Sequence, residues 1–212
     1  MRYIYLALLL LMFYISYKGF LVCKKAPFKI KILAGISIVG IIIRNIALII
    51  MLLNKNLAYL YLLKPLIYLN YVCMPVIVCI TLCILARNNK INFWYLFIVL
   101  FASIALYTIV ILRGSINITI SMELGYLTRV LNDKCLKNIA FVFYTVCLMW
   151  CITLINKKNE NRMLIVFAAL ICVISIIEII LNVLNIEFIP NLLVSNSLWL
   201  ILLNCILYKI KR

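Results

Sequence analysis

The stretch "ILAGISIVGIIIRNIALIIMLL", residues 32–53, decides the class of this protein. An α-helix needs about 20 predominantly apolar residues to cross the roughly 30 Å hydrocarbon core of a bilayer. The stretch supplies them, and its single charged side chain is Arg44. It therefore predicts a transmembrane helix, and it raises the question of what compensates the charge of Arg44.

The composition of the whole chain leads to the same class. Of the 212 residues, 68% are hydrophobic and 12% are charged. Soluble domains have about 45–50% apolar and about 25% charged residues. Because a domain of this size must still cover its surface, the apolar excess cannot all be hidden inside a globule in water. The composition predicts an integral membrane protein.

Apolar segments recur along the chain and predict seven membrane spans. Backbone polar groups must be paired in lipid, so each span is expected to be a helix. We expect the third span to tilt or to kink near Pro65 or Pro75. The N-terminal segment is expected to be a retained span, because its apolar run is long and no signal-peptide cleavage site follows. The predicted fold is all-α, a bundle of seven transmembrane helices in a single domain over residues 1–212, with spans at 2–23, 32–53, 57–86, 91–112, 138–156, 163–186 and 190–208.

Lysine and arginine predict the orientation. Most of them fall on one side of the predicted spans, where the one acidic residue is Glu160. By the positive-inside rule this side is the cytoplasm, which places the N-terminus outside, the C-terminus inside and the 113–137 loop outside. Cytoplasmic loops and anionic lipids explain the net charge of +16 without a nucleic-acid partner. The bias toward Ile, Asn, Lys and Tyr suggests the plasma membrane of an A+T-rich bacterium.

The exterior loop at 113–137 has two interpretations. Its segment "INITI" alternates with β-branched residues, so the loop is expected either to form a hairpin or interfacial helix over the outer mouth, or to be a disordered turn.

The residue inventory argues against an enzyme. The chain has no histidine, no glycine-rich phosphate loop and no pair of acidic residues on one span, so we predict no catalytic residues and no cofactor. Cys79 with Cys83, and Cys147 with Cys151, are spaced to present two thiolates to a metal. Cysteine also packs as a small hydrophobe, and C-x-x-C is absent, so no metal site is expected.

Three charged residues lie inside the predicted spans at a similar depth. Arg44, Lys64 and Glu178 are each about 10–13 Å from the outer end of their helix at 1.5 Å per residue. Polar side chains accompany them on the same helix faces or in the seventh span. The candidate ligand-binding residues are Arg44, Asn45, Lys64, Tyr68, Glu178, Asn182 and Asn196.

Two interpretations of these charges remain open. If Glu178 pairs with Arg44 or Lys64, one cation is left over, and it would suit an anionic or carbonyl-bearing ligand that enters from outside. Alternatively, Arg44 and Glu178 form a structural clamp, and Lys64 extends to the interface.

Residues 60–94, "LYLLKPLIYLNYVCMPVIVCITLCILARNNKINFW", carry a family resemblance. An aromatic–leucine entry, "YLNY", the mid-span Pro75 and a basic turn before an aromatic residue resemble the N-terminal seven-transmembrane sensor region of bacterial histidine kinases. The resemblance implies that seven helices sense a stimulus and relay it to a cytoplasmic output module. Asn70 stands where that family tends to have glycine, and no kinase follows Arg212. It therefore implies an orphan sensor module or a truncated relative, and it transfers no ligand residues.

These observations favour a receptor-like or sensor-like module. We expect it to bind a small ligand or peptide in an outer polar pocket and to act through a membrane or cytoplasmic protein partner. A small transporter for an anionic or polar solute is one alternative, although polar residues are sparse in the inner half of the spans. A membrane protein that confers immunity or protection is another.

Overall fold

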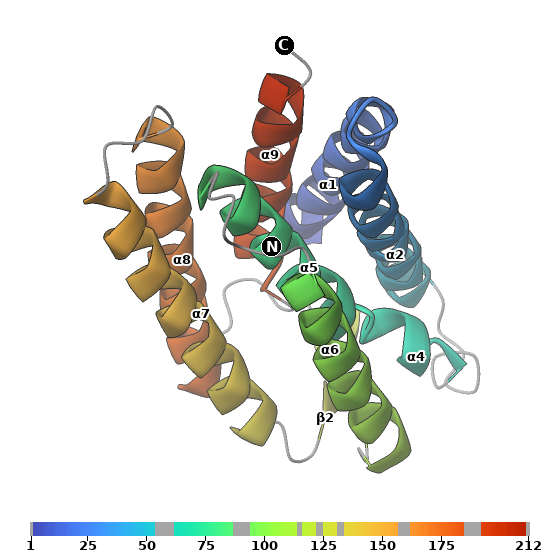
Figure 1. Cartoon of the computed structure of the whole chain (residues 1–212). Coiled ribbons are helices and arrows are strands. Elements are labelled where there is room, and N and C mark those ends of the chain that lie inside the picture. The colour runs from blue at the N-terminus through green and yellow to red at the C-terminus, as the bar shows by residue number, and fades with distance from the viewer. Residues whose placement is uncertain are drawn as a thin grey trace.

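The structure of the chain is a computed structural model, shown in Figure 1. It describes residues 2–53, 62–86, 94–113, 116–121, 125–130, 134–156, 162–184 and 192–210. The described residues form helices and one short hairpin, which lies between α6 and α7 in the chain. In chain order the elements are α1 (Arg2–Cys23), α2 (Phe28–Leu53), α4 (Lys64–Ile67), α5 (Asn70–Ala86), α6 (Trp94–Arg113), β1 (Ile116–Ser121), β2 (Gly125–Val130), α7 (Lys134–Ile155), α8 (Arg162–Val183) and α9 (Leu193–Ile210).

Six segments of the described chain are long and apolar enough to cross a membrane. The seventh predicted span corresponds to a shorter apolar helix at Leu193–Lys209. The helical fold class and the multi-pass character are thus supported by element length and composition. The six segments are Tyr3–Cys23, Phe28–Leu53, Lys64–Ala86, Tyr95–Leu112, Cys135–Ile155 and Arg162–Val183.

The third predicted span is divided. Its described part consists of α4 and α5, and the helix is interrupted at Tyr68 and Leu69. Pro65 is tolerated because it lies in the first turn of α4, where its missing N–H has no intrahelical partner. Pro75 lies inside α5 and cannot donate to the carbonyl of Tyr71, four residues earlier. The break therefore lies between the two prolines where the kink was predicted. Residues 57–61 of this span are outside the described residues.

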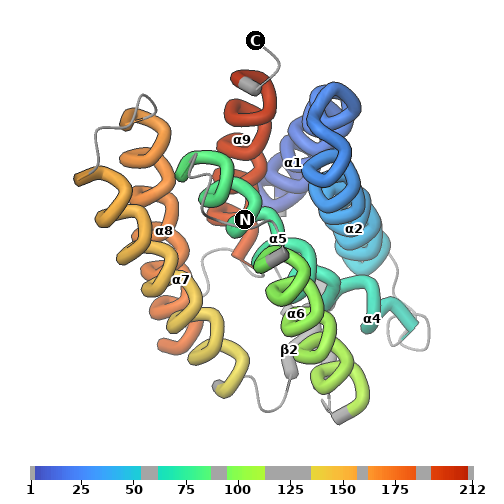
Figure 2. Tube along the Cα trace, in the orientation of Figure 1, coloured from blue at the N-terminus to red at the C-terminus, as the bar shows by residue number. Residues whose placement is uncertain are grey.

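Helix α5 lies at the centre of the bundle. It packs against α2, α6, α8 and α9, while α1 packs against α2 and α9, and α7 packs against α8. Figures 1 and 2 show α5 between the α1–α2 pair and the α7–α8 pair. In its span, 61% of the residues are buried, against 17% in α6 and 22% in α7. A movement of α5 would therefore change its contacts with four other helices of the bundle.

The described part of the 113–137 loop forms a hairpin, which is one of the structures expected for it. Strands β1 and β2 are antiparallel, in a register that pairs Ile116 with Val130 and Ser121 with Gly125. Strand β2 also contacts α2. The hairpin is the only β-sheet in the part of the chain that the structure describes.

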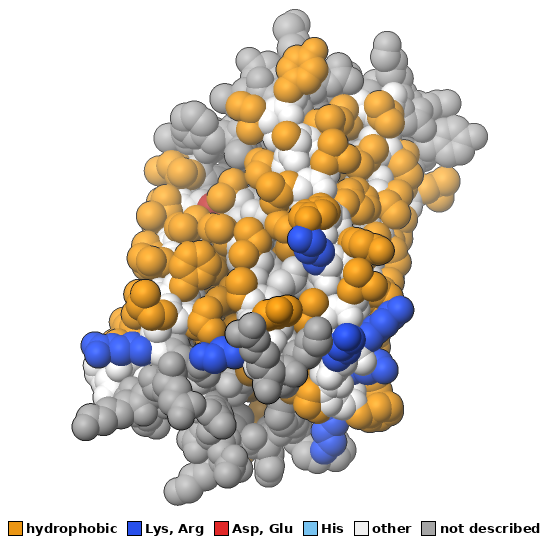
Figure 3. Space-filling view, turned by 90° about the horizontal axis from the view of Figure 1, so that it is seen from above, with side chains coloured by type: hydrophobic (Ala, Val, Ile, Leu, Met, Phe, Trp, Pro, Cys, Tyr) orange, Lys and Arg blue, Asp and Glu red, His pale blue; other side chains and the backbone are white. Residues whose placement is uncertain are grey.

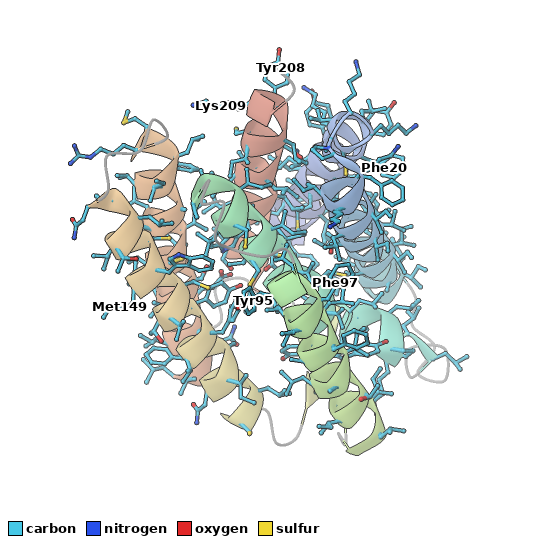
Figure 4. All side chains as sticks on the ribbon, viewed as in Figure 1. Phe20, Tyr95, Phe97, Met149, Tyr208 and Lys209 are labelled. Atoms are coloured by element: carbon cyan, nitrogen blue, oxygen red, sulfur yellow. The ribbon has the colours of Figure 1, made fainter. Side chains whose placement is uncertain are left out.

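Large apolar side chains cover the outside of the bundle. Phe101 of α6 is 69% exposed and Met149 of α7 is 67% exposed. Figure 3 shows one face of the molecule on which hydrophobic side chains predominate, and in Figure 4 Met149 lies on the outer side of α7. A soluble protein rarely exposes contiguous apolar surface of this extent. The surface, like the helix lengths, fits a chain embedded in a membrane.

Candidate functional site

Arg44 is buried where α2 and α5 approach each other closely. Gly40 lies one turn before Arg44, and a Cβ placed on Gly40 would collide with Sγ of Cys73 on α5. The absence of a side chain at Gly40 therefore allows the two helices to meet. Arg44 is only 2% exposed as a result, and its guanidinium lies alongside α5.

The electrostatic neighbours of Arg44 come from three helices. They are Tyr5 of α1, Tyr71 and Cys73 of α5, and Glu178 of α8. Tyr5 is buried at 5% exposure, although nothing in the pattern of the first span marks it as a site residue. The structure thus brings Arg44 and Glu178 into one region of the core.

Glu178 nevertheless makes its direct contact with α9. Its Oε2 accepts a hydrogen bond of 3.1 Å from the backbone N–H of Ser195. Helix α9 begins at Leu193, so this N–H is one of those that a helix leaves without an intrahelical partner. The carboxylate also faces the positive end of the helix dipole. Glu178 therefore caps α9. Its interaction with Arg44 is a longer-range electrostatic one.

Lys64 similarly contacts a helix end, in this case the C-terminal end of α6. Its Nζ donates a hydrogen bond of 2.8 Å to the carbonyl of Ile111, in the last turn of α6. A cation at this end is stabilised by the helix dipole. The hydroxyl of Tyr107 donates to the carbonyl of Pro65 at 2.9 Å and reinforces the α4–α6 contact. The structure places Lys64 against the end of α6, as a link between helices.

Tyr68 and Asn182 also take part in contacts between elements. The ring of Tyr68 stacks on that of Tyr71 with centroids 6.0 Å apart. Asn182 contributes its backbone carbonyl, which accepts a hydrogen bond of 3.1 Å from Nζ of Lys137 near the end of α8. Tyr68 thus packs against Tyr71, an electrostatic neighbour of Arg44, while Lys137 links α7 to the end of α8 through Asn182.

Asn196 joins α9 to the start of α5. It is completely buried, and its Nδ2 donates to Oδ1 of Asn70 at 3.3 Å. Asn70 was notable in the sequence only as a departure from the glycine of the sensor-region pattern. Its position as a polar residue within an apolar span is the feature of the sequence that could have identified Asn70 as a contact residue. We call Arg44, Asn45, Asn70, Tyr71, Glu178 and Asn196 the polar centre.

A second hydrogen-bonded contact joins α8 and α9 one helical turn away from the Glu178–Ser195 bond. Trp199 of α9 is fully buried, and its Nε1 donates to Oγ of Ser175 on α8 at 3.4 Å. The hydroxyl of Ser175 in turn donates to the carbonyl of Ile171. These bonds fix α8 and α9 one turn below the Glu178–Ser195 contact. The orientation of Glu178 is thereby held by its own helix and by the helix that it caps.

Asn45 has the most unusual environment of the predicted residues. Its side chain is fully buried, and neither Nδ2 nor Oδ1 has a hydrogen-bond partner among the described residues. Oε1 of Glu178 is likewise without one in the described part of the chain. Each buried polar atom left unsatisfied costs about 1–3 kcal/mol. The amide of Asn45 and one oxygen of Glu178 are thus buried polar groups without a hydrogen-bond partner among the described residues.

The cysteines do not extend this chemistry. All nine are free thiols, and most are buried among apolar side chains. Within the described ranges, no group of three or more His, Cys, Asp or Glu residues is arranged to hold a metal ion. The six buried thiols belong to the packing of the core.

No protein-family model matches the chain, and no curated protein matches its sequence. The resemblance of residues 60–94 to sensor regions therefore stays a prediction. What the protein does has to be inferred from the chemistry of the polar centre.

Proposed function

We propose that this protein is a receptor-like membrane protein that binds a small polar ligand at the polar centre. The ligand would carry a carboxylate or carbonyl group beside Arg44 and Asn45 and would enter from the outside of a bacterial plasma membrane. Binding would be passed to a membrane or cytoplasmic protein partner. The observation that carries this proposal is the buried amide of Asn45, whose donor and acceptor both lack a described partner.

The chemistry of the polar centre suggests which ligand groups would be bound. An acidic or carbonyl oxygen is attracted by the charge of Arg44 and can accept from Nδ2 of Asn45. Oε1 of Glu178 can accept from a donor on the same ligand, because Oε2 is already engaged by Ser195. A ligand with both an acceptor and a donor therefore fits better than a simple inorganic anion.

The position of α5 supports a signalling role. Arg44 lies beside α5, and Asn196 is bonded to its first residue, so a ligand held between α2 and α9 would act directly on this helix. The interruption at Tyr68 and Leu69 gives α5 a point about which its direction can change. Because α5 contacts four other helices, such a change would reach most of the bundle.

The transporter alternative requires a polar path from the polar centre to the other side. The described part of α9 below the polar centre presents large buried apolar residues instead, among them Trp199, Leu203 and Ile206. The polar residue in this region, Asn204, donates to the carbonyl of Ile15 and links α9 to α1. This packing favours binding without passage.

A binding experiment tests the proposal. Glycine and N-acetylglycine serve as probes at millimolar concentration, and the midpoint of thermal unfolding in detergent is the measurement. We expect at least one probe to raise the midpoint of the wild type but not of Asn45→Leu, which removes the amide with little change in volume. Ser37→Ala is the matched control, because Ser37 is buried on the same helix but bonds to the carbonyl of Leu33.

Two results would count against the ligand site. The first is that neither probe raises the midpoint of thermal unfolding of the wild type. The second is that the midpoint of Asn45→Leu rises as much as that of the wild type. The relay to a partner needs a separate measurement, crosslinking in native membranes. A chain that stays monomeric and without a partner there would contradict that part of the proposal.

A further inference from the structure

The turn between α1 and α2 gathers lysines at one end of the bundle. All are exposed, and no acidic residue lies between the first and the last of them. The thiol of Cys23, the last residue of α1, donates to the carbonyl of Lys31 at 3.4 Å, so the first turn of α2 is held against the end of α1. We call this group the basic turn, and its members are Lys18, Lys24, Lys25, Lys29 and Lys31.

Lys18 lies within a candidate membrane span. It precedes Cys23 by five residues, which corresponds to about 7 Å along the helix axis. Its Nζ is 4.5 Å from the centroid of the Tyr14 ring, so the ammonium is turned toward the middle of α1 and away from the turn. Both side chains are exposed on the outside of the bundle. A cation in this position faces lipid and needs a counter-charge that lipid or a partner must supply.

Lys24 repeats the arrangement closer to the turn. Its Nζ is 5.3 Å from the centroid of the Phe20 ring, and Figure 4 shows Phe20 on the outer side of α1. Lys18 and Lys24 are six residues apart, so the two ammonium groups lie at depths that differ by about 9 Å. Each aromatic ring holds the cation that follows it by four residues and thereby reduces the freedom of the lysine.

Apolar side chains continue the same outer face of α1 away from the lysines. Leu10 is 55% exposed and Tyr17 is 62% exposed, and Leu21 is exposed between them and the turn. The face thus combines positive charge at its end with an apolar surface along its length. An anionic phospholipid has the complementary distribution, a phosphate at one end and acyl chains along the other.

We propose that the basic turn binds the phosphate headgroup of an anionic phospholipid, with the acyl chains lying along the outer face of α1. Lysine ammonium groups act as point charges for phosphate. Anionic lipids are concentrated in the cytoplasmic leaflet, which is the side predicted for this turn. The site is separate from the polar centre and does not depend on the proposed function.

Native mass spectrometry in a neutral detergent tests the proposal. Phosphatidylglycerol is compared with phosphatidylcholine of the same acyl chains, and glycerol phosphate is added as a headgroup without chains. The test variant combines Lys18→Gln, Lys24→Gln and Lys29→Gln. The control combines Lys157→Gln, Lys158→Gln and Arg162→Gln, which changes the net charge equally at positions far from the basic turn in the sequence.

The wild type is expected to bind phosphatidylglycerol more tightly than phosphatidylcholine. The test variant should lose about fivefold in affinity for each lysine removed, and the control should keep the wild-type affinity. Tyr14→Leu should weaken binding more than Tyr14→Phe, which retains the ring and serves if the triple variant does not fold.

Four results would overturn the proposal. The first is that the wild type binds the two lipids equally. The second is that both triple variants lose the same affinity, which is expected if the lipid is attracted only by the net charge of the protein. Glycerol phosphate binds as tightly as the lipid, which would indicate a soluble ligand. The last result is an acidic protein that copurifies with the wild type but not with the test variant, while the two proteins bind phosphatidylglycerol equally. This result would identify a protein partner in place of a lipid.

Discussion

Substituting Gly40 with alanine tests the close approach of α2 and α5 that positions Arg44. The added Cβ would collide with Sγ of Cys73, which is buried and has little room to move. Overpacking of this kind costs about 1–3 kcal/mol. Alanine also raises helix propensity over glycine by about 1 kcal/mol, which acts in the opposite direction. We therefore expect Gly40→Ala to destabilise the fold by up to about 2 kcal/mol.

A double-mutant cycle separates these two effects. Cys73→Ala removes the sulfur that the new methyl group meets, so the double variant should keep the gain in helix propensity without the collision. The expected coupling between the two substitutions is about 1–3 kcal/mol in favour of the double variant. The free energy of unfolding is measured for all four proteins by titration with sodium dodecyl sulfate in mixed micelles, followed by circular dichroism.

Gly35→Ala is the control, because among the described residues no atom outside its own stretch of α2 lies within 4 Å of a Cβ at that position. It should be neutral or stabilising. If Gly40→Ala and Cys73→Ala have additive effects within about 0.5 kcal/mol, the two residues are not in contact and the placement of Arg44 beside α5 is wrong.

Two further predictions concern the helix ends. Glu178→Leu should speed hydrogen exchange of the Ser195 amide more than Glu178→Gln, since glutamine keeps an oxygen for the 3.1 Å bond, and equal exchange in the two variants would refute the cap on α9. Lys64→Met should lower the midpoint of thermal unfolding through loss of the bond to Ile111, worth about 1 kcal/mol, and Lys64→Arg should restore most of it; an equal loss in both variants would contradict the role of Lys64 at the end of α6.

The sequence by itself determined the helical fold class of the protein and predicted a common level for its charged residues. A stretch such as 32–53 must form a helix and exclude water, because lipid offers no partner for an open backbone. The fixed rise of a helix then places Arg44 and Glu178 at similar depths. The burial of Arg44 follows too, since a guanidinium at that depth is strongly disfavoured facing lipid.

Only the tertiary structure decided which group each charge meets. The sequence suggested that Glu178 pairs with a cation, yet its carboxylate accepts a hydrogen bond from the N–H of Ser195. Lys64 in turn donates to the carbonyl of Ile111. Asn70 and Asn196 are 126 residues apart and meet only because α5 and α9 pack together. Backbone groups become partners when a helix ends beside them, and a single sequence does not show which helix ends lie side by side.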